Sequence, residues 1–176
     1  FSEPNVAAAC GFVLPRHVET LWERGRYVEY LFAFSFYKQI QDFYRKPLIS
    51  SGCFSVYRTK ILKENGGWAT RTLAEDMDLT WSYYAKGYEV RFIPEALCYP
   101  IEPHNFLFMR KQLKRWSHGF VQNAFALVVY SGNQLSELHG DGRPVGCGVG
   151  LICVLDFVAD FGGPFYEPLL FVRVHY

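Results

Sequence analysis

The sequence predicts an α/β fold, and its first three segments carry that prediction. Residues 6–14 form a short apolar run that Pro15 closes, as expected of a buried strand. Residues 18–44 are rich in aromatic side chains and have the length of a helix. Residues 53–57 alternate well enough to form a second strand. A strand, a helix and another strand in this order are typical of α/β domains.

Residues 59–65 can form a short helix. We expect Thr59 to cap its start, because a threonine hydroxyl can accept a hydrogen bond from a free backbone N–H group. Gly66 and Gly67 are expected to end it, because glycine adopts the left-handed conformation that closes many helices. The residues that follow, up to Leu73, are predicted to form a loop.

A longer helix is predicted over residues 75–86. Its first turn holds three acidic residues, Glu75, Asp76 and Asp78, and Gly87 lies just past its end. The helix dipole favours negative charge near the N-terminus, and glycine is favoured after the C-terminus. Both signals therefore agree on the boundaries of this helix.

Two short strands are predicted next, over residues 89–93 and 96–99. Pro94 lies between them and interrupts an otherwise extended stretch. From about Asn105 the pattern changes to that of a helix.

The predicted C-terminal helix runs through a basic stretch, residues 110–115, into a more apolar continuation, residues 119–130. Residues 132–144 are polar and rich in turn-forming residues, which predicts a loop. Residues 145–172 are strongly apolar but are interrupted by glycines, a proline and two aspartates. Because a spanning helix needs about 20 apolar residues, this tail is either a buried core segment or a truncated membrane segment.

The composition indicates one globular domain that contacts something apolar. Of the 176 residues, 50% are hydrophobic and 18% aromatic, which is high, while 20% are charged. The formal net charge is +1, so no overall field favours nucleic acid as a partner. Any site for an anion must therefore be local.

The cysteines fit free thiols better than disulfides or a zinc site. They are odd in number, widely spaced and mostly among apolar neighbours. This favours a reducing, cytosolic environment. The cysteines are Cys10, Cys53, Cys98, Cys147 and Cys153.

Gln112, Arg115 and Trp116 form the most specific chemical pattern. Positions i, i+3 and i+4 of a helix share one face, so an amide, a guanidinium and an indole would be presented together. Arg115 could bind a diphosphate through two hydrogen bonds, and Trp116 could stack on a sugar ring. The alternative is an amphipathic helix that lies on a membrane surface, with its basic residues on lipid head groups.

Asp76 is a candidate general base, because it lies in the first turn of the helix predicted over residues 75–86. The alternative is that acids at a helix start only stabilise the helix. Asp76 and Asp78 also resemble a metal-binding Asp-x-Asp pair. Side chains at i and i+2 point to different sides of a helix, which argues against chelation of one ion.

Four motifs occur in a fixed order: Ser-Gly-Cys-Phe-Ser-Val-Tyr-Arg (51–58), Gly-Gly-Trp (66–68), Ala-Glu-Asp (74–76) and Gln-x-x-Arg-Trp (112–116). This set resembles the processive family 2 inverting glycosyltransferases, a group that includes cellulose, hyaluronan, chitin-oligosaccharide and poly-N-acetylglucosamine synthases. The likeness covers roughly residues 1–120. It implies part of a GT-A-like domain, the fold of many nucleotide-diphospho-sugar transferases.

The resemblance implies roles for individual residues. Asp76 would be the base that deprotonates the acceptor hydroxyl, with Glu75 beside it in a Thr-Glu-Asp motif whose threonine is replaced by Ala74. Arg115 would lie near the pyrophosphate and Trp116 beneath the terminal sugar of the acceptor. Further substrate-binding residues on this basis are Gln112, Ser51, Gly52 and Cys53.

The resemblance also implies what lies outside this chain. The family binds the nucleotide and Mg²⁺ or Mn²⁺ through an N-terminal half that we expect before Phe1, so the chain would be a fragment that is inactive alone. Residues 1–118 would be the C-terminal half of the catalytic domain, and residues 119–176 an interfacial helix, a polar loop and a possible truncated membrane segment. The partners would be a UDP-sugar, with a preference for UDP-N-acetylglucosamine, a glycan acceptor and the cytoplasmic face of the plasma (inner) membrane.

Overall fold

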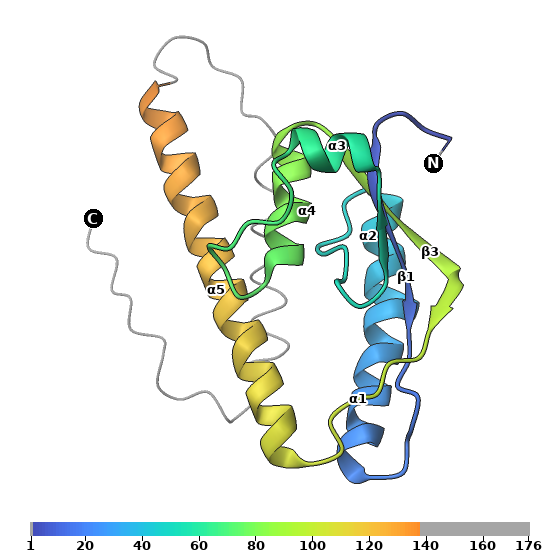
Figure 1. Cartoon of the computed structure of the whole chain (residues 1–176). Helices are drawn as coiled ribbons and strands as arrows, with labels where there is room; N and C mark the ends of the chain where they lie inside the picture. The colour runs from blue at the N-terminus through green and yellow to red at the C-terminus, as the bar shows by residue number, and fades with distance from the viewer. Residues whose placement is uncertain (1, 138–176) are drawn as a thin grey trace. The chain divides into compact units, whose positions relative to one another are not determined.

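The computed structural model describes residues 2–137, and the fold below is that of the compact unit Phe1–Ser131. Strands and helices alternate in it, which confirms the α/β prediction (Figure 1). In chain order the elements are β1 (Val6–Val13), α1 (Leu21–Phe32), η1 (Ala33–Tyr37), α2 (Lys38–Phe43), β2 (Ser55–Tyr57), α3 (Thr59–Glu64), α4 (Glu75–Ala85), β3 (Glu89–Cys98) and α5 (Phe106–Glu137).

The sheet has the order β2-β1-β3, with β1 antiparallel to β2 and parallel to β3. The two short strands predicted on either side of Pro94 are one strand, β3, so that division was wrong. The pairing is nevertheless irregular there, because Gly11 lies opposite Ile93 and the next residue, Phe12, lies opposite Leu97. Proline has no N–H group for the ladder, so the strand continues past it with a bulge.

The predicted aromatic-rich helix is confirmed as one continuous rod made of α1, η1 and α2 (Figure 1). It begins with a capping box in which Thr20 and Glu23 bond each other's backbone N–H groups. The π-helical segment η1 lies in the middle of this rod, and its residue Phe34 is buried in the core. The rod thereby packs on the sheet through aromatic side chains.

Two clusters form the core. Leu79 and Tyr83 of α4 pack with Ile61 of α3 and with small residues of β1. Phe34 packs with Cys10 of β1 and with Phe92 of β3. Alanines at the centre of β1 let the helices approach the sheet closely, because they fill little space.

Glycines lie just after the C-terminal ends of α3 and α4. Gly66 and Gly67 have φ angles of 87° and 75° and end α3, and Gly87, at 80°, follows α4, as predicted. Thr59 does not cap α3, so that prediction was wrong. The N-cap residue is Arg58, and no side-chain hydrogen bond caps this helix.

The helix predicted from Asn105 is confirmed, and the Asn105 side chain accepts a hydrogen bond from the N–H of Phe108. α5 runs to Glu137, so the loop predicted from Gly132 does not begin there. A single glycine within a helix costs only about 1 kcal/mol, which neighbouring residues can offset. The predicted loop after Glu137 and the apolar tail, residues 145–172, lie outside the described residues.

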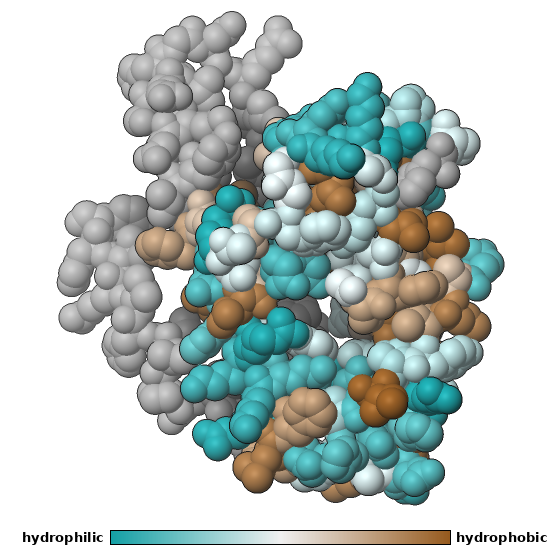
Figure 2. Space-filling model, viewed as in Figure 1, coloured by the Kyte–Doolittle hydropathy of each residue, from teal (hydrophilic) through white to brown (hydrophobic). Residues whose placement is uncertain are grey.

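Apolar side chains reach the surface in separate patches among polar residues (Figure 2). The rod of α1 to α2 contributes several of them, including Val28, Phe32, Phe36 and Ile40, at intervals of four residues. None of the helices within residues 2–137 is both long and apolar enough to cross a membrane.

Candidate active site

Asp76 is held at the start of α4 by two backbone N–H groups. Its Oδ2 accepts a hydrogen bond from Gly52, at 2.7 Å, and its Oδ1 accepts one from Met77, at 2.9 Å. A Cβ atom at position 52 would lie 3.1 Å from Asp76 Oδ2, so glycine permits this approach. The structure therefore brings together Gly52 and Asp76, which lie 24 residues apart in the sequence.

The loop that carries Gly52 is fixed along one face of α4. The Thr80 hydroxyl accepts a hydrogen bond from the buried N–H of Ser50, at 2.8 Å, and donates to the carbonyl of Asp76, at 2.7 Å. The Trp81 indole donates to the carbonyl of Leu48, and one turn farther on the Tyr84 hydroxyl donates to that of Pro47. Residues 47–52 and the carboxylate of Asp76 are thus parts of one rigid unit.

Ser51 and Cys53 flank Gly52 in a tight turn, which a hydrogen bond from Phe54 N to the Ser51 carbonyl closes. The Ser51 hydroxyl lies 3.1 Å from the Cys53 sulfur. Partial burial of the sulfur raises the pKa of Cys53, although the residue as a whole is exposed. A neutral thiol is a poor nucleophile, so this cysteine fits a lining role better than covalent chemistry.

Side chains of α5 form hydrogen bonds with the two residues that precede α4. The N-cap residue Ala74 has no side-chain hydrogen bond with which to cap the helix. Instead, Arg115 donates to the Leu73 carbonyl, at 3.0 Å, and Gln122 accepts from the Leu73 N–H, at 2.9 Å. The buried side chain of Asn123 donates to the Ala74 carbonyl, at 3.0 Å. These contacts with residues 42 to 49 positions away in the sequence hold the two residues before α4 in place.

Gly119 allows α5 to approach this closely. A Cβ atom there would lie 2.5 Å from the Ala74 Cβ and 2.6 Å from the Ala74 nitrogen, distances that real atoms do not tolerate. Ala74 itself is buried. The small side chain at position 74, which departs from the threonine of the resembling family, is therefore in direct contact with α5.

The predicted face of Gln112, Arg115 and Trp116 is present on α5, but its members have different surroundings. Arg115 is exposed, whereas Gln112 and Trp116 are half-buried. The Trp116 ring lies against the guanidinium of Arg26, 4.9 Å from ring centre to carbon. The Gln112 Oε1 atom is buried and has no hydrogen-bond partner among residues 2–137. Glu75 is exposed at the first position of α4.

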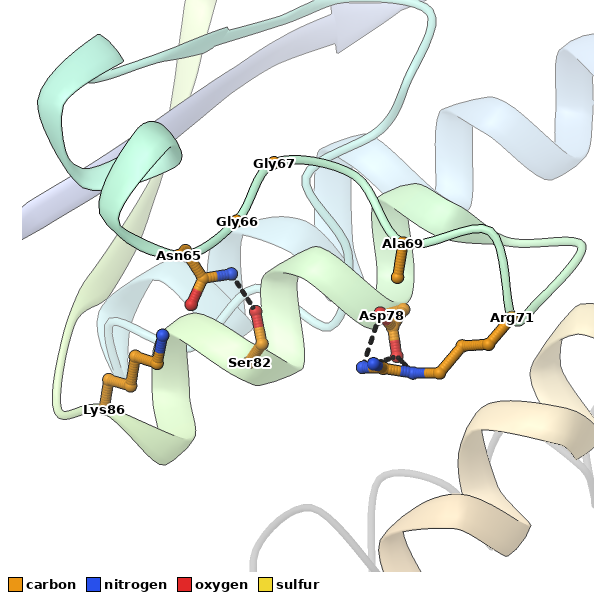
Figure 3. Close-up of a pocket in the computed structure, with 8 residues that line it drawn as sticks. All are labelled: Asn65, Gly66, Gly67, Ala69, Arg71, Asp78, Ser82 and Lys86. Atoms are coloured by element: carbon orange, nitrogen blue, oxygen red, sulfur yellow. Dashed lines mark hydrogen bonds and ion pairs between the residues drawn. The ribbon is translucent and has the colours of Figure 1, made fainter.

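Asp78 points away from Asp76. The Arg71 guanidinium forks onto the carboxylate of Asp78, with bonds of 2.7 to 3.0 Å. Figure 3 shows this pair beside a pocket of about 340 Å³ between α4 and the loop after α3, whose other lining residues include Asn65, Ser82 and Lys86. Because the two aspartates have separate partners, they cannot chelate one ion in this arrangement. The part of the chain that the structure describes holds no cluster of three metal-binding side chains.

Several residues around the site were not predicted from the sequence. Gln122 and Asn123 contact the two residues before α4, and Arg26 contacts Trp116. These contacts span long sequence separations, which no local pattern reveals. Gly119 offered one signal, because a glycine inside a helix commonly marks a close contact.

The family follows from a comparison with known proteins. Residues 1–172 match the model of "Glycosyl transferase family group 2". The chain belongs to this family. The resemblance to family 2 glycosyltransferases that the motifs indicate is thereby confirmed.

Similar proteins include two bacterial enzymes named poly-beta-1,6-N-acetyl-D-glucosamine synthase. The one from Staphylococcus epidermidis is 27% identical over 116 residues, and the one from Staphylococcus aureus strain COL is 24% identical over 117 residues. Each match covers 66% of this chain and 28% of the relative. The chain thus corresponds to little more than a quarter of the length of these relatives.

Proposed function

We propose that this chain is the acceptor-binding and base-carrying part of a membrane-bound inverting glycosyltransferase. The whole protein would transfer a sugar from a UDP-sugar to a growing β-linked polysaccharide. The observation that supports this most directly is that three motifs meet at the start of α4. Asp76 lies in its first turn, Gly52 is hydrogen-bonded to the Asp76 carboxylate, and Arg115 is hydrogen-bonded to Leu73, two residues before the helix.

The chemistry assigned to Asp76 is removal of the proton from the acceptor hydroxyl. That oxygen would then attack the anomeric carbon of the donor sugar as the bond to the diphosphate breaks on the opposite side, which inverts the configuration. The hydrogen bonds from Gly52 and Met77 fix the carboxylate in place, and positioning is the first requirement for a general base.

Arg115 would bind the leaving group of the donor, and Trp116 would bind the acceptor. The exposed Arg115 could exchange its bond to the Leu73 carbonyl for charge-assisted bonds to the leaving diphosphate. The half-buried Trp116 would offer an aromatic surface to the terminal acceptor sugar. The Gln112 side chain would turn its oxygen, which is buried and has no hydrogen-bond partner among residues 2–137, toward a sugar hydroxyl. Glu75, Ser51 and Cys53 would line the same site.

Mg²⁺ or Mn²⁺ is part of the proposal for the whole protein only. Asp76 and Asp78 do not fit a shared metal site, because they bind different partners. The ion and the nucleotide would be bound by segments other than these, and none of the steps assigned to this chain depends on the ion.

We further propose N-acetylglucosamine as the transferred sugar, which the names of the two relatives support. Membrane attachment would place the catalytic domain on the cytoplasmic side of the plasma membrane. The exposed basic residues Arg110, Lys111 and Lys114 of α5, together with exposed Phe106 and Leu107, are suited to a lipid surface. We propose a GT-A-like fold for the complete domain.

The test is UDP release by the full-length protein that carries this chain, with UDP-N-acetylglucosamine as donor. We expect Asp76→Asn to lower turnover about 10²- to 10⁴-fold and Arg115→Ala to lower it about 10²- to 10³-fold. Arg115→Lys should be intermediate, because it keeps the charge and loses the fork. Lys60→Ala, at a position that is 83% exposed on α3, is the matched control.

Near-normal turnover in both Asp76→Asn and Arg115→Ala would contradict the proposal. If these variants instead keep their turnover and Arg115→Ala loses binding to anionic vesicles, the alternative, a non-catalytic membrane-surface or scaffold module, is favoured.

A further inference from the structure

A largely buried cluster of charged side chains joins α1 to the segment that precedes α5. Its centre is Arg26, of which only 1% is exposed. The guanidinium bonds the Glu29 carboxylate, the Tyr30 hydroxyl at 2.6 Å, and the carboxylate of Glu102 at 3.4 Å. Glu102 is 5% exposed and also accepts a hydrogen bond from Tyr30, at 2.8 Å.

Two aromatic rings lie against the guanidinium of Arg26. The ring centre of Tyr30 is 4.5 Å from its central carbon and that of Trp116 is 4.9 Å away. A cation this close to a ring is attracted by the negative charge of the ring face, most strongly by that of tryptophan. The attraction is not weakened by water here, because Arg26 is fully buried.

The orientation of Arg26 is determined by its partners. The two carboxylates and the Tyr30 hydroxyl bind different atoms of the planar guanidinium, so that the plane cannot rotate without breaking a bond. Since Trp116 lies against this fixed plane, its ring is restrained as well. The free energy of burying a charge is offset only by such a complete set of partners.

We propose that Arg26 is a positioning residue for the candidate acceptor platform Trp116. This inference rests on the proposed function, in which Trp116 binds the terminal sugar. Arg26 touches no reacting atom in that scheme. It sets the plane of the indole, and with it the affinity for the acceptor.

The first measurement is independent of activity. The full-length protein is labelled with 5-fluorotryptophan, and the ¹⁹F resonance of Trp116 is identified by its absence from Trp116→Phe. We expect Arg26→Lys to shift or broaden this resonance, because lysine keeps the charge but has no planar group to lie against the indole ring. Arg24→Lys, an exposed arginine of the same helix, should leave it unchanged.

The second measurement separates positioning from catalysis. With UDP-N-acetylglucosamine in excess, Arg26→Lys should raise the KM for an acceptor oligosaccharide about three- to tenfold while kcat changes less than twofold. A merely structural role would lower kcat and the amount of folded protein together. Tyr30→Phe keeps the ring and removes one bond to the guanidinium, so it should show the same change to a smaller degree.

If Arg26→Lys fails to fold, Tyr30→Phe still tests whether Arg26 positions the Trp116 ring. An unchanged Trp116 resonance and an unchanged acceptor KM in the folded variants overturn the inference. If wild-type protein shows no sugar transfer at all, the proposed function fails, whereas the resonance of Trp116 still reports whether Arg26 fixes the ring.

Discussion

At one end of the candidate site the Asp76 carboxylate is held by neutral backbone groups, whereas at the other end the Trp116 ring lies against a buried guanidinium. The first arrangement uses hydrogen bonds from Gly52 and Met77. The second uses Arg26, whose charge is balanced by Glu29 and Glu102. The candidate base is thus fixed by groups that do not titrate, and the candidate platform by groups that do.

The two arrangements should differ in how much stability is lost when one partner is removed. Each hydrogen bond to the Asp76 carboxylate comes from a backbone N–H group of its own, so the loss of one should loosen the Asp76 end only locally. A buried charge that loses a partner destabilises the protein much more, because the remaining charge is left without compensation. We therefore expect the Trp116 end to be the more fragile of the two.

The largest effect is expected from Glu102→Ala. It removes a carboxylate from Arg26 and the acceptor of the Tyr30 hydroxyl. Loss of one partner from a buried ion pair costs about 3–5 kcal/mol, and the remaining Glu29 should keep the cost near the lower limit. Urea unfolding measures it, with exposed Glu95→Ala as control. A cost as small as that of the control would show that the ionic cluster does not stabilise the fold.

Gly119→Ala should cost about 1–3 kcal/mol, because its Cβ would collide with Ala74. Helix propensity alone predicts the opposite sign, a gain of about 1 kcal/mol. Gly25→Ala in α1 is the matched control, because a Cβ there has no atom within 4 Å, and it should raise the melting temperature. Equal gains in both variants would mean that α5 can move away from α4 freely.

Thr80→Val tests the Asp76 end. The two side chains have similar shapes, but valine leaves the N–H of the fully buried Ser50 without its acceptor. Such a loss costs about 1–3 kcal/mol, and it should also increase amide hydrogen exchange in residues 50–52. Thr59→Val, at an exposed position without a capping bond, is the control and should change stability by less than about 0.5 kcal/mol.

The smallest effect concerns pH. Burial raises the pKa of Glu29 above its ordinary value of 4.5, even though Arg26 acts in the other direction. The folded protein therefore binds this proton more tightly than the unfolded chain. The stability that Glu29 contributes in this way is fully present below pH 4.5 and is lost as the pH rises through the raised pKa of the folded state.

Glu29→Gln removes this dependence. As the pH is lowered from 8 to 4, the unfolding free energy of wild-type protein should therefore rise relative to that of the variant. Parallel profiles would contradict a raised pKa. Thr80→Val should instead shift the profile by a constant amount, because no titrating group is involved, which would sharpen the contrast between the two ends of the site.

The sequence predicted those features that depend on neighbouring residues. The glycines at 66, 67 and 87 mark the ends of α3 and α4, because a positive φ is a local requirement. The apolar run of β1 and the length of the rod from α1 to α2 were equally clear. Thr59 was misjudged because the N-cap position lies one residue earlier, at Arg58.

The sequence predicted residues of the candidate site but not the contacts between them. Asp76, Gly52 and Arg115 were found through motifs, but their contacts join segments 24 and 42 residues apart. The pairing of Arg26 with Glu102 spans 76 residues. No periodicity or composition encodes such a contact, since it arises from the packing of α1 against the segment that precedes α5.

The contact between Gly119 and Ala74 makes the side chain that fits at one of these positions depend on the side chain at the other. Gly119 has no side chain to reduce, so position 74 cannot gain atoms that point toward α5. A threonine there must either turn its extra atoms aside or hold α5 farther from α4. Because Asp76 lies on α4 and the face of Gln112, Arg115 and Trp116 lies on α5, the residue at position 74 limits how closely the two helices that carry these residues can approach each other.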